Sequence, residues 1–160
     1  MRFISTQTIL DIANQVYAEK EFSLKQILPF AEIHHVGSTA VPGSLTKGDL
    51  DINVRVTQQD FDKSVKILKN HFGIAQSQNW KPYFANFQDI GEKRISTGIQ
   101  LSVIDSPGDC FLKIRQVLLT KPELLKGYNE MKQKHEGDDP EIYWRDKDAF
   151  FRKLLEDNKN

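Results

Sequence analysis

Two aspartates separated by one residue are the side chains of this sequence best suited to chemistry. Asp49 and Asp51 open the segment 49–56, in which acidic or polar residues alternate with apolar ones. A period of two predicts a β-strand, so both carboxylates should project from one face, with Cα atoms about 6.5 Å apart. Carboxylates at this separation can share one or two magnesium ions, and a two-ion site clamps the attacking and leaving oxygens of an in-line displacement. We predict that Asp49 and Asp51 are catalytic metal ligands.

A Gly-Ser pair precedes these aspartates and predicts a place for phosphates. Residues 32–36 read as a strand that stops at Gly37, and ten residues separate Ser38 from Asp49. Glycine allows close approach to the backbone, and the free amides of a helical turn, with the Ser38 hydroxyl, can receive phosphate oxygens. Lys47 could offset the charge of a triphosphate, the alternative being a solvated loop lysine. Gly37, Ser38 and Lys47 are therefore the predicted nucleotide-binding residues.

Each half of this constellation also has an ordinary structural explanation. A Gly-Ser pair after a strand is usually a turn, and an Asp-x-Asp on a strand is often a solvated edge. The order of the two halves and the ten-residue gap between them favour function over coincidence.

The same residues carry a family resemblance. Gly37-Ser38 followed by Asp49-Leu50-Asp51 resembles the motif of the DNA polymerase beta-type nucleotidyltransferase superfamily. The run HVGSTAVPGSLTK, residues 35–47, is similar to the hallmark of the GrpB family, also called UPF0157. Residues in the order expected of that family's C-terminal helices follow downstream: Arg115, Leu118, Pro122, Tyr128, Asn129, Lys132, Tyr143, Lys147 and Phe150. The resemblance covers nearly the whole chain and implies a minimal nucleotidyltransferase core in a cytoplasmic bacterial protein, without fixing a substrate.

The chain departs from the family pattern on a late strand. Family members usually carry histidines where this sequence has Gln100 and Ser102. Superfamily enzymes commonly use a third carboxylate on a later strand as general base, and the predicted strand 94–104 holds no acidic residue. The nearest candidates are Asp89, Glu92 and Asp105. A carboxylate within about 5 Å of the aspartate pair would favour an enzyme, and an empty third position would favour a nucleotide-binding module.

Periodicity predicts the elements that must position these side chains. We expect helices at 5–18, 23–29, 58–72, 109–119, 122–135 and 140–156, and strands at 32–36, 49–56, 74–78, 81–87 and 94–104. Helices flanking a mixed central sheet define an α+β fold, and the resemblance implies a nucleotidyltransferase-like fold with C-terminal helices. No linker interrupts the sequence, so residues 1–160 are expected to form one GrpB-like domain.

Composition narrows the class of partner. The sequence has 22 basic and 22 acidic residues, so it lacks the basic excess expected of a duplex-binding module, and a nucleic-acid partner is disfavoured. The single cysteine, Cys110, cannot form an internal disulfide, which fits a reducing compartment. No apolar run approaches the ~20 residues of a membrane span. We expect a cytoplasmic protein without a membrane partner.

The remaining conspicuous residues have structural interpretations. We expect His35 to be a satisfied, half-buried histidine and Arg94 to be structural rather than phosphate-binding. The aromatic residues Trp80, Tyr83, Phe84 and Phe87 are expected to pack in the core, with stacking of a base as the alternative. We interpret the sign-balanced charges of the C-terminal region, including Lys132 and Lys147, as a solvated face.

Our leading hypothesis is a magnesium-dependent nucleotidyltransferase that uses a nucleoside triphosphate and a small-molecule or protein acceptor. The alternative is a catalytically silent nucleotide-binding or interaction module. A regulatory link to coenzyme A synthesis rests only on the fusion of related domains to dephospho-coenzyme A kinases.

Overall fold

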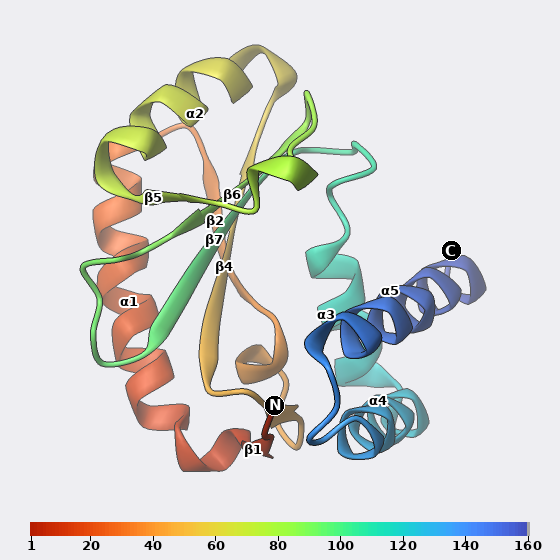
Figure 1. Ribbon diagram of the computed structural model, residues 1–160. Coiled ribbons are helices and arrows are strands. Elements are labelled where there is room, and N and C mark those ends of the chain that lie inside the picture. The colour runs from red at the N-terminus through yellow and green to blue at the C-terminus, as the bar shows by residue number, and fades with distance from the viewer. Residues whose placement is uncertain (160) are drawn as a thin grey trace.

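A five-stranded mixed sheet lies at the centre of the protein (Figure 1). The computed structural model describes residues 1–159. The strands lie in the order β2-β4-β7-β6-β5, and only β4 and β7 are parallel neighbours. Their bounds are β2 Glu32–Val36, β4 Asp49–Val56, β5 Gly73–Ala75, β6 Phe84–Gln88 and β7 Ser96–Val103. A separate two-stranded sheet joins β1 (Ile4–Ser5) to β3 (Leu45–Thr46). The aspartate pair therefore lies on an internal strand, with a neighbour on each side.

One face of the sheet carries the larger core. The apolar residues of β4 all point to this face and are at most 1% exposed: Leu50, Ile52, Val54 and Val56. Helices α1 (Leu10–Ile27) and α2 (Gln58–His71) cover it (Figure 1), contributing Val16 and Leu68 among others. Because side chains alternate along a strand, the intervening residues Asp49, Asp51 and Asn53 point to the opposite face.

Three helices form a second packed region on the other side of the sheet. They are α3 (Phe111–Thr120), α4 (Pro122–Lys134) and α5 (Pro140–Asp157) (Figure 1). Their core includes Val117, Tyr128 and Leu154, and it also contains Val41 from the segment that follows β2. The Gly-Ser turn is thereby packed against helices that come much later in the sequence. Within residues 1–159, no helix combines the length and apolar composition needed to cross a membrane.

The structure confirms the predicted α+β class, with a mixed central sheet flanked by helices and further helices at the C-terminal end. Strands 32–36 and 49–56 have the predicted bounds. The predicted strands at 74–78, 81–87 and 94–104 correspond to β5, β6 and β7, each with shifted ends. The last four predicted helices correspond to α2, α3, α4 and α5 within a few residues.

The predicted pair of N-terminal helices is wrong. Residues 5–18 and 23–29 were expected to form two helices, whereas the chain forms β1, a 3-10 turn at Thr6–Thr8 and one continuous α1. No glycine or proline lies between Ala18 and Ser23, so nothing in the backbone interrupts the helix there.

Candidate active site

A tight contact joins the Gly-Ser turn to the aspartate pair. Gly37 follows β2 with a φ of +75°, in the left-handed region that favours glycine. The Asp51 carboxylate lies directly against the Gly37 Cα, because a Cβ built on Gly37 would overlap Asp51 Oδ2. The register agrees, since Val36 pairs with Asp51 across β2 and β4. Two residues predicted to act together, 14 positions apart in the sequence, are thus in contact.

The segment after Gly37 forms the predicted helical turn. Ser38–Ala40 is a 3-10 helix, η2, in which Ala40 N donates to Gly37 O and Val41 N donates to Ser38 O. The first amides of such a helix have no acceptor within it, which leaves those of Ser38 and Thr39 available to an anion. Gly37 is exposed and Ser38 is half-buried, so the turn opens to solvent.

Residues behind the turn fix its position. His35 Nε2 bonds to Thr39 Oγ1 at 2.8 Å, and its ring stacks on Tyr17 with centroids 5.0 Å apart. Arg115 Nη1 donates to the His35 carbonyl at 2.6 Å. Burial, with the Arg115 charge as a second cause, lowers the pKa of His35 to about 4, so the imidazole is neutral at physiological pH. The expectation of a satisfied, half-buried histidine is confirmed.

The carboxylates of Asp49 and Asp51 leave the same face of β4, as predicted. Both residues are half-buried, and Lys47 Nζ lies 3.8 Å from Asp49 Oδ2. Burial, together with the negative charge of Asp49, raises the pKa of Asp51 to about 6. The raised pKa means that this negative charge is incompletely compensated by the protein. Two carboxylates on one strand face are a donor set that fits a divalent cation, which would favour the ionised form of Asp51.

The neighbouring strand places an amide, not a carboxylate, beside Asp51. Gln100, on the neighbouring β7, donates from Nε2 to Asp51 Oδ1 at 3.2 Å. The residue opposite Asp51 in the register is Gly98, which has no side chain to offer. Within residues 1–159 there is no group of three or more His, Cys, Asp or Glu residues placed to hold a metal ion.

The three candidate carboxylates lie elsewhere. Asp89 Oδ2 lies 2.6 Å from Lys20 Nζ, and Glu92 Oε2 lies 2.8 Å from Arg94 Nη2. Asp105 follows β7 at the far end of the sheet, since Val103 pairs with the last residue of β4. None of them lies beside the aspartate pair, so the third carboxylate position is empty. An empty third position is the outcome that favours a nucleotide-binding module.

Lys132 is a site residue that the sequence-based interpretation missed. It was expected on a solvated face, which is wrong: Lys132 is 1% exposed, and its Nζ donates to Ser38 Oγ at 2.7 Å and to Ser44 Oγ at 3.2 Å. Its Nζ also lies 3.7 Å from the Tyr128 ring centroid. Burial first, and then the positive charge of Lys147, lowers the pKa of Lys132 to about 6. The family resemblance included this lysine, and that was the only signal of its role.

Lys147 also approaches the site from α5. It is half-buried, and its charge opposes the rise in the Asp51 pKa as well as lowering that of Lys132. Three lysines thus surround the turn and the carboxylates: Lys47, Lys132 and Lys147.

The other predicted roles are structural. Arg94 binds Glu19 of α1 and Glu92, as expected of a structural residue. Trp80 packs against Phe87 with ring centroids 5.3 Å apart, which agrees with core packing. Burial raises the pKa of Cys110 and so disfavours a reactive thiolate.

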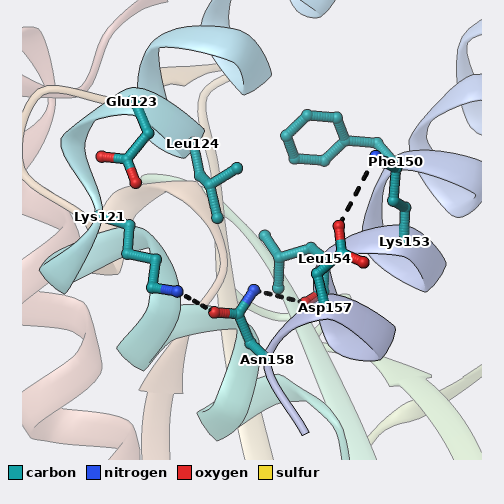
Figure 2. A pocket seen from close by; sticks show the side chains of 8 residues that line it. All are labelled: Lys121, Glu123, Leu124, Phe150, Lys153, Leu154, Asp157 and Asn158. Carbon is teal, nitrogen blue, oxygen red and sulfur yellow. Dashed lines mark hydrogen bonds and ion pairs between the residues drawn. The ribbon is translucent and has the colours of Figure 1, made fainter.

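A hollow of about 310 Å³ lies within the C-terminal helices and is separate from this site (Figure 2). Its lining residues are Lys121, Glu123, Leu124, Phe150, Lys153, Leu154, Asp157 and Asn158. Lys121 donates to Asn158 Oδ1, and Asn158 Nδ2 donates to the Leu154 carbonyl at 2.8 Å (Figure 2). Because these polar groups bind one another, the hollow lacks a set of converging groups that would select a ligand.

The fold is an α+β fold in which a mixed sheet presents an aspartate pair beside a Gly-Ser turn. The family model described as GrpB protein matches residues 11–157, so the chain belongs to the GrpB family. This confirms the family identified from the sequence.

Individual relatives extend over most of the chain. A UPF0157 protein of Vibrio cholerae is 28% identical over 156 residues, covering 97% of this chain and 82% of the relative. The crystal structure of GrpB from Enterococcus faecalis matches with a TM-score of 0.70 at 18% identity, covering 92% of this chain and 95% of that one. A structure of the Cid1 poly(U) polymerase with MgGTP bound matches with a TM-score of 0.45 at 16% identity, covering 79% of this chain and 46% of that one.

Proposed function

We propose that this GrpB protein is a magnesium-dependent nucleotidyltransferase that transfers a nucleotidyl group from a nucleoside triphosphate to a small-molecule or protein acceptor. The observation that carries the proposal is the Asp51 carboxylate lying against Gly37 of the Gly-Ser turn. This contact brings the proposed metal ligand beside the proposed phosphate-binding turn. The formal net charge of zero disfavours a nucleic-acid acceptor.

Asp49 and Asp51 would hold the magnesium. Their fit rests on two carboxylates that leave one strand face, where burial and then the charge of Asp49 raise the pKa of Asp51. Bound magnesium would supply positive charge to the reacting phosphate oxygens. Lys47, 3.8 Å from Asp49, would offset further negative charge as pyrophosphate leaves.

The Gly-Ser turn would hold the β- and γ-phosphates. The amides of Ser38 and Thr39 open η2, and the Ser38 hydroxyl lies 2.7 Å from Lys132 Nζ. A phosphate bound to Ser38 would therefore meet a buried amine, and the added negative charge would favour its protonated form. Binding would thus supply the counter-charge that Lys132 lacks in the free protein.

A nucleotide-binding module without turnover is the second candidate. It is favoured by one observation: the side chain beside Asp51 on the neighbouring strand is the amide of Gln100, and not a third carboxylate. General acid–base catalysis typically contributes 10²–10⁴-fold, so its loss alone would slow transfer without removing the contributions of metal and positioning. We therefore keep transfer as the leading proposal and expect it to be slow.

A thermal-shift screen of the four ribonucleoside triphosphates, with and without magnesium, tests the binding part of the proposal. A ligand that binds only the native state at a hundredfold excess over its Kd adds about 2.7 kcal/mol of stability. We expect at least one triphosphate to raise the Tm only with magnesium. Asp51→Asn should remove that response, whereas Asp62→Asn, at an exposed position in α2, should retain it.

Incorporation of label from an α-³²P nucleoside triphosphate into candidate acceptors separates the two candidate functions. Label transfer that requires Asp51 supports the enzyme. Magnesium-dependent binding without transfer supports the module. If Asp51→Asn bound the magnesium–nucleotide as tightly as the wild type, the site assignment itself would be wrong.

A further inference from the structure

Two buried amide oxygens on the polar face of the sheet lack hydrogen-bond donors. Within residues 1–159, Gln100 Oε1 and Asn53 Oδ1 are buried without a partner. The third such atom, Asp89 Oδ2, differs because it lies 2.6 Å from Lys20 Nζ. Gln100 and Asn53 occupy paired positions on β7 and β4. Both unsatisfied oxygens therefore belong to one cross-strand pair, next to Asp51.

The Gln100 amide is oriented with its nitrogen toward the aspartate pair. Nε2 donates to Asp51 Oδ1 at 3.2 Å, which leaves Oε1 on the side without a donor. A half-turn of the terminal amide would exchange the two atoms, since the oxygen and nitrogen occupy nearly equivalent positions. Oε1 would then take the place that Nε2 occupies now, 3.2 Å from Asp51 Oδ1.

That separation suits two oxygens bound to the same divalent cation. Octahedral magnesium binds oxygens at 2.0–2.1 Å, so adjacent ligands lie about 2.9 Å apart, and the longer bonds of calcium give about 3.4 Å. Gly98 lies next to both groups, because a Cβ built on it would lie 3.4 Å from Asp51 Oδ1 and from Gln100 Nε2. As a glycine, it adds no side chain between them.

We propose that Gln100 is a third ligand of the divalent cation held by Asp49 and Asp51, binding through Oε1 after rotation of its amide. This inference rests on the proposed function. The rotation would bring Gln100 Oε1, which is buried without a donor in the free protein, to the cation beside Asp51. Cation binding would thereby give this unpaired oxygen a partner.

Calorimetric titration of Mg²⁺ alone, and of Mn²⁺ alone, at pH 8 tests this role. Gln100→Leu should weaken cation binding at least tenfold, since even changes to groups behind metal ligands cost 10–100-fold. Gln100→Glu should tighten it, because a carboxylate replaces a neutral ligand. Gln88→Leu is the matched control: Gln88 lies one strand further away, bonds to Ser96 Oγ at 3.2 Å, and should leave the affinity unchanged.

A spectroscopic readout follows the amide itself. In a ¹⁵N–¹H spectrum, the side-chain amide signals of Gln100 and Gln88 are assigned as the pairs that disappear in Gln100→Leu and in Gln88→Leu. On addition of Mg²⁺ to the wild type, the Gln100 pair should shift, and the Gln88 pair should shift less. An unshifted Gln100 signal at saturating Mg²⁺ would contradict the rotation.

The outcomes separate this inference from the proposed function. Cation binding that is lost in Asp51→Asn but kept within twofold in Gln100→Leu overturns the role of Gln100 alone. A wild type that binds neither cation, with or without nucleotide, overturns both. If Gln100→Leu does not fold, the cation affinity of Gln100→Glu provides the test. A Gln100→Glu affinity for Mg²⁺ and Mn²⁺ no higher than that of the wild type overturns the proposal.

Discussion

The two faces of the central sheet differ in the side chains that they bury. On one face, the apolar residues of β4 are fully covered by α1 and α2. On the other, the same strand carries Asp51 with a raised pKa and Asn53 with an unpaired oxygen. Burial of apolar side chains on the first face stabilises the fold. On the second face, the buried polar groups are not fully paired within the protein, and this costs stability. A strand can therefore stabilise the fold with one face and hold a ligand with the other.

The largest change in stability should come from the apolar face. Leu50→Ala removes a fully buried side chain from the core and should lower the free energy of unfolding by about 2–5 kcal/mol. Leu119→Ala, at a residue that is 47% exposed, is the matched control and should change it by less than about 1 kcal/mol. Urea unfolding measures both. Equal losses in the two variants would contradict the assignment of the core.

Gly37→Ala should break the connection between the Gly-Ser turn and the aspartate pair. The new Cβ would overlap the Asp51 carboxylate, and the φ of +75° is unfavourable for alanine. We expect at least a hundredfold loss of magnesium–nucleotide affinity by calorimetry. Gly48→Ala is the control, because Gly48 has a φ of +95° but open space around its Cα. Similar losses in both variants would assign the effect to backbone strain alone.

Asp51→Asn should stabilise the free protein, the opposite of a change on the apolar face. The pKa of Asp51 is about 6 in the folded state, against about 3.9 for an unfolded aspartate, so the wild type loses stability as the pH rises through this window. Asparagine does not titrate, and the variant should gain about 1–2 kcal/mol above pH 7.

That gain should shrink as the pH falls from 6 to 4, because protonation then relieves the wild type of the same cost. Urea unfolding at pH 4 and pH 8 without divalent cations measures the difference. An Asp51→Asn variant no more stable than the wild type at pH 8 would show that the carboxylate is already compensated by its neighbours.

The smallest stability change should come from Lys132→Met. Methionine keeps the apolar length of the side chain and removes the cost of a buried amine, while Ser38 and Ser44 lose a donor. We expect a net change within about 1 kcal/mol in unfolding and about a tenfold loss of nucleotide affinity. Arg94→Met, at a residue bound to Glu19 and Glu92, should leave affinity unchanged. Unchanged affinity in Lys132→Met would remove this lysine from the proposed phosphate site.

Local patterns predicted the elements that carry the site. Alternation along 49–56 gave the strand and the shared face of Asp49 and Asp51, and the Gly-Ser pair gave the turn after β2. The extent of α1 was mispredicted, because a weakly amphipathic stretch between two apolar stripes does not reveal whether the helix continues through it.

The misinterpretation of Lys132 has a different origin. In the sequence it lies among charges of both signs, which is typical of a solvated helix. In the structure α4 packs beside the Gly-Ser turn and directs Lys132 to Ser38, 94 positions earlier. No local pattern contains that information, since it depends on how two separate packed regions meet.

The amino-acid sequence by itself determined the α+β class, the family and the side of β4 from which the aspartates project, because periodicity and turn chemistry act over a few neighbouring residues. Only the tertiary structure decided which groups complete the site: Gly37 against Asp51, Gln100 beside Asp51, and Lys132 at Ser38. These contacts arise from strand pairing and helix packing between distant segments, and burial there sets the pKa values and the unpaired oxygens on which binding would depend.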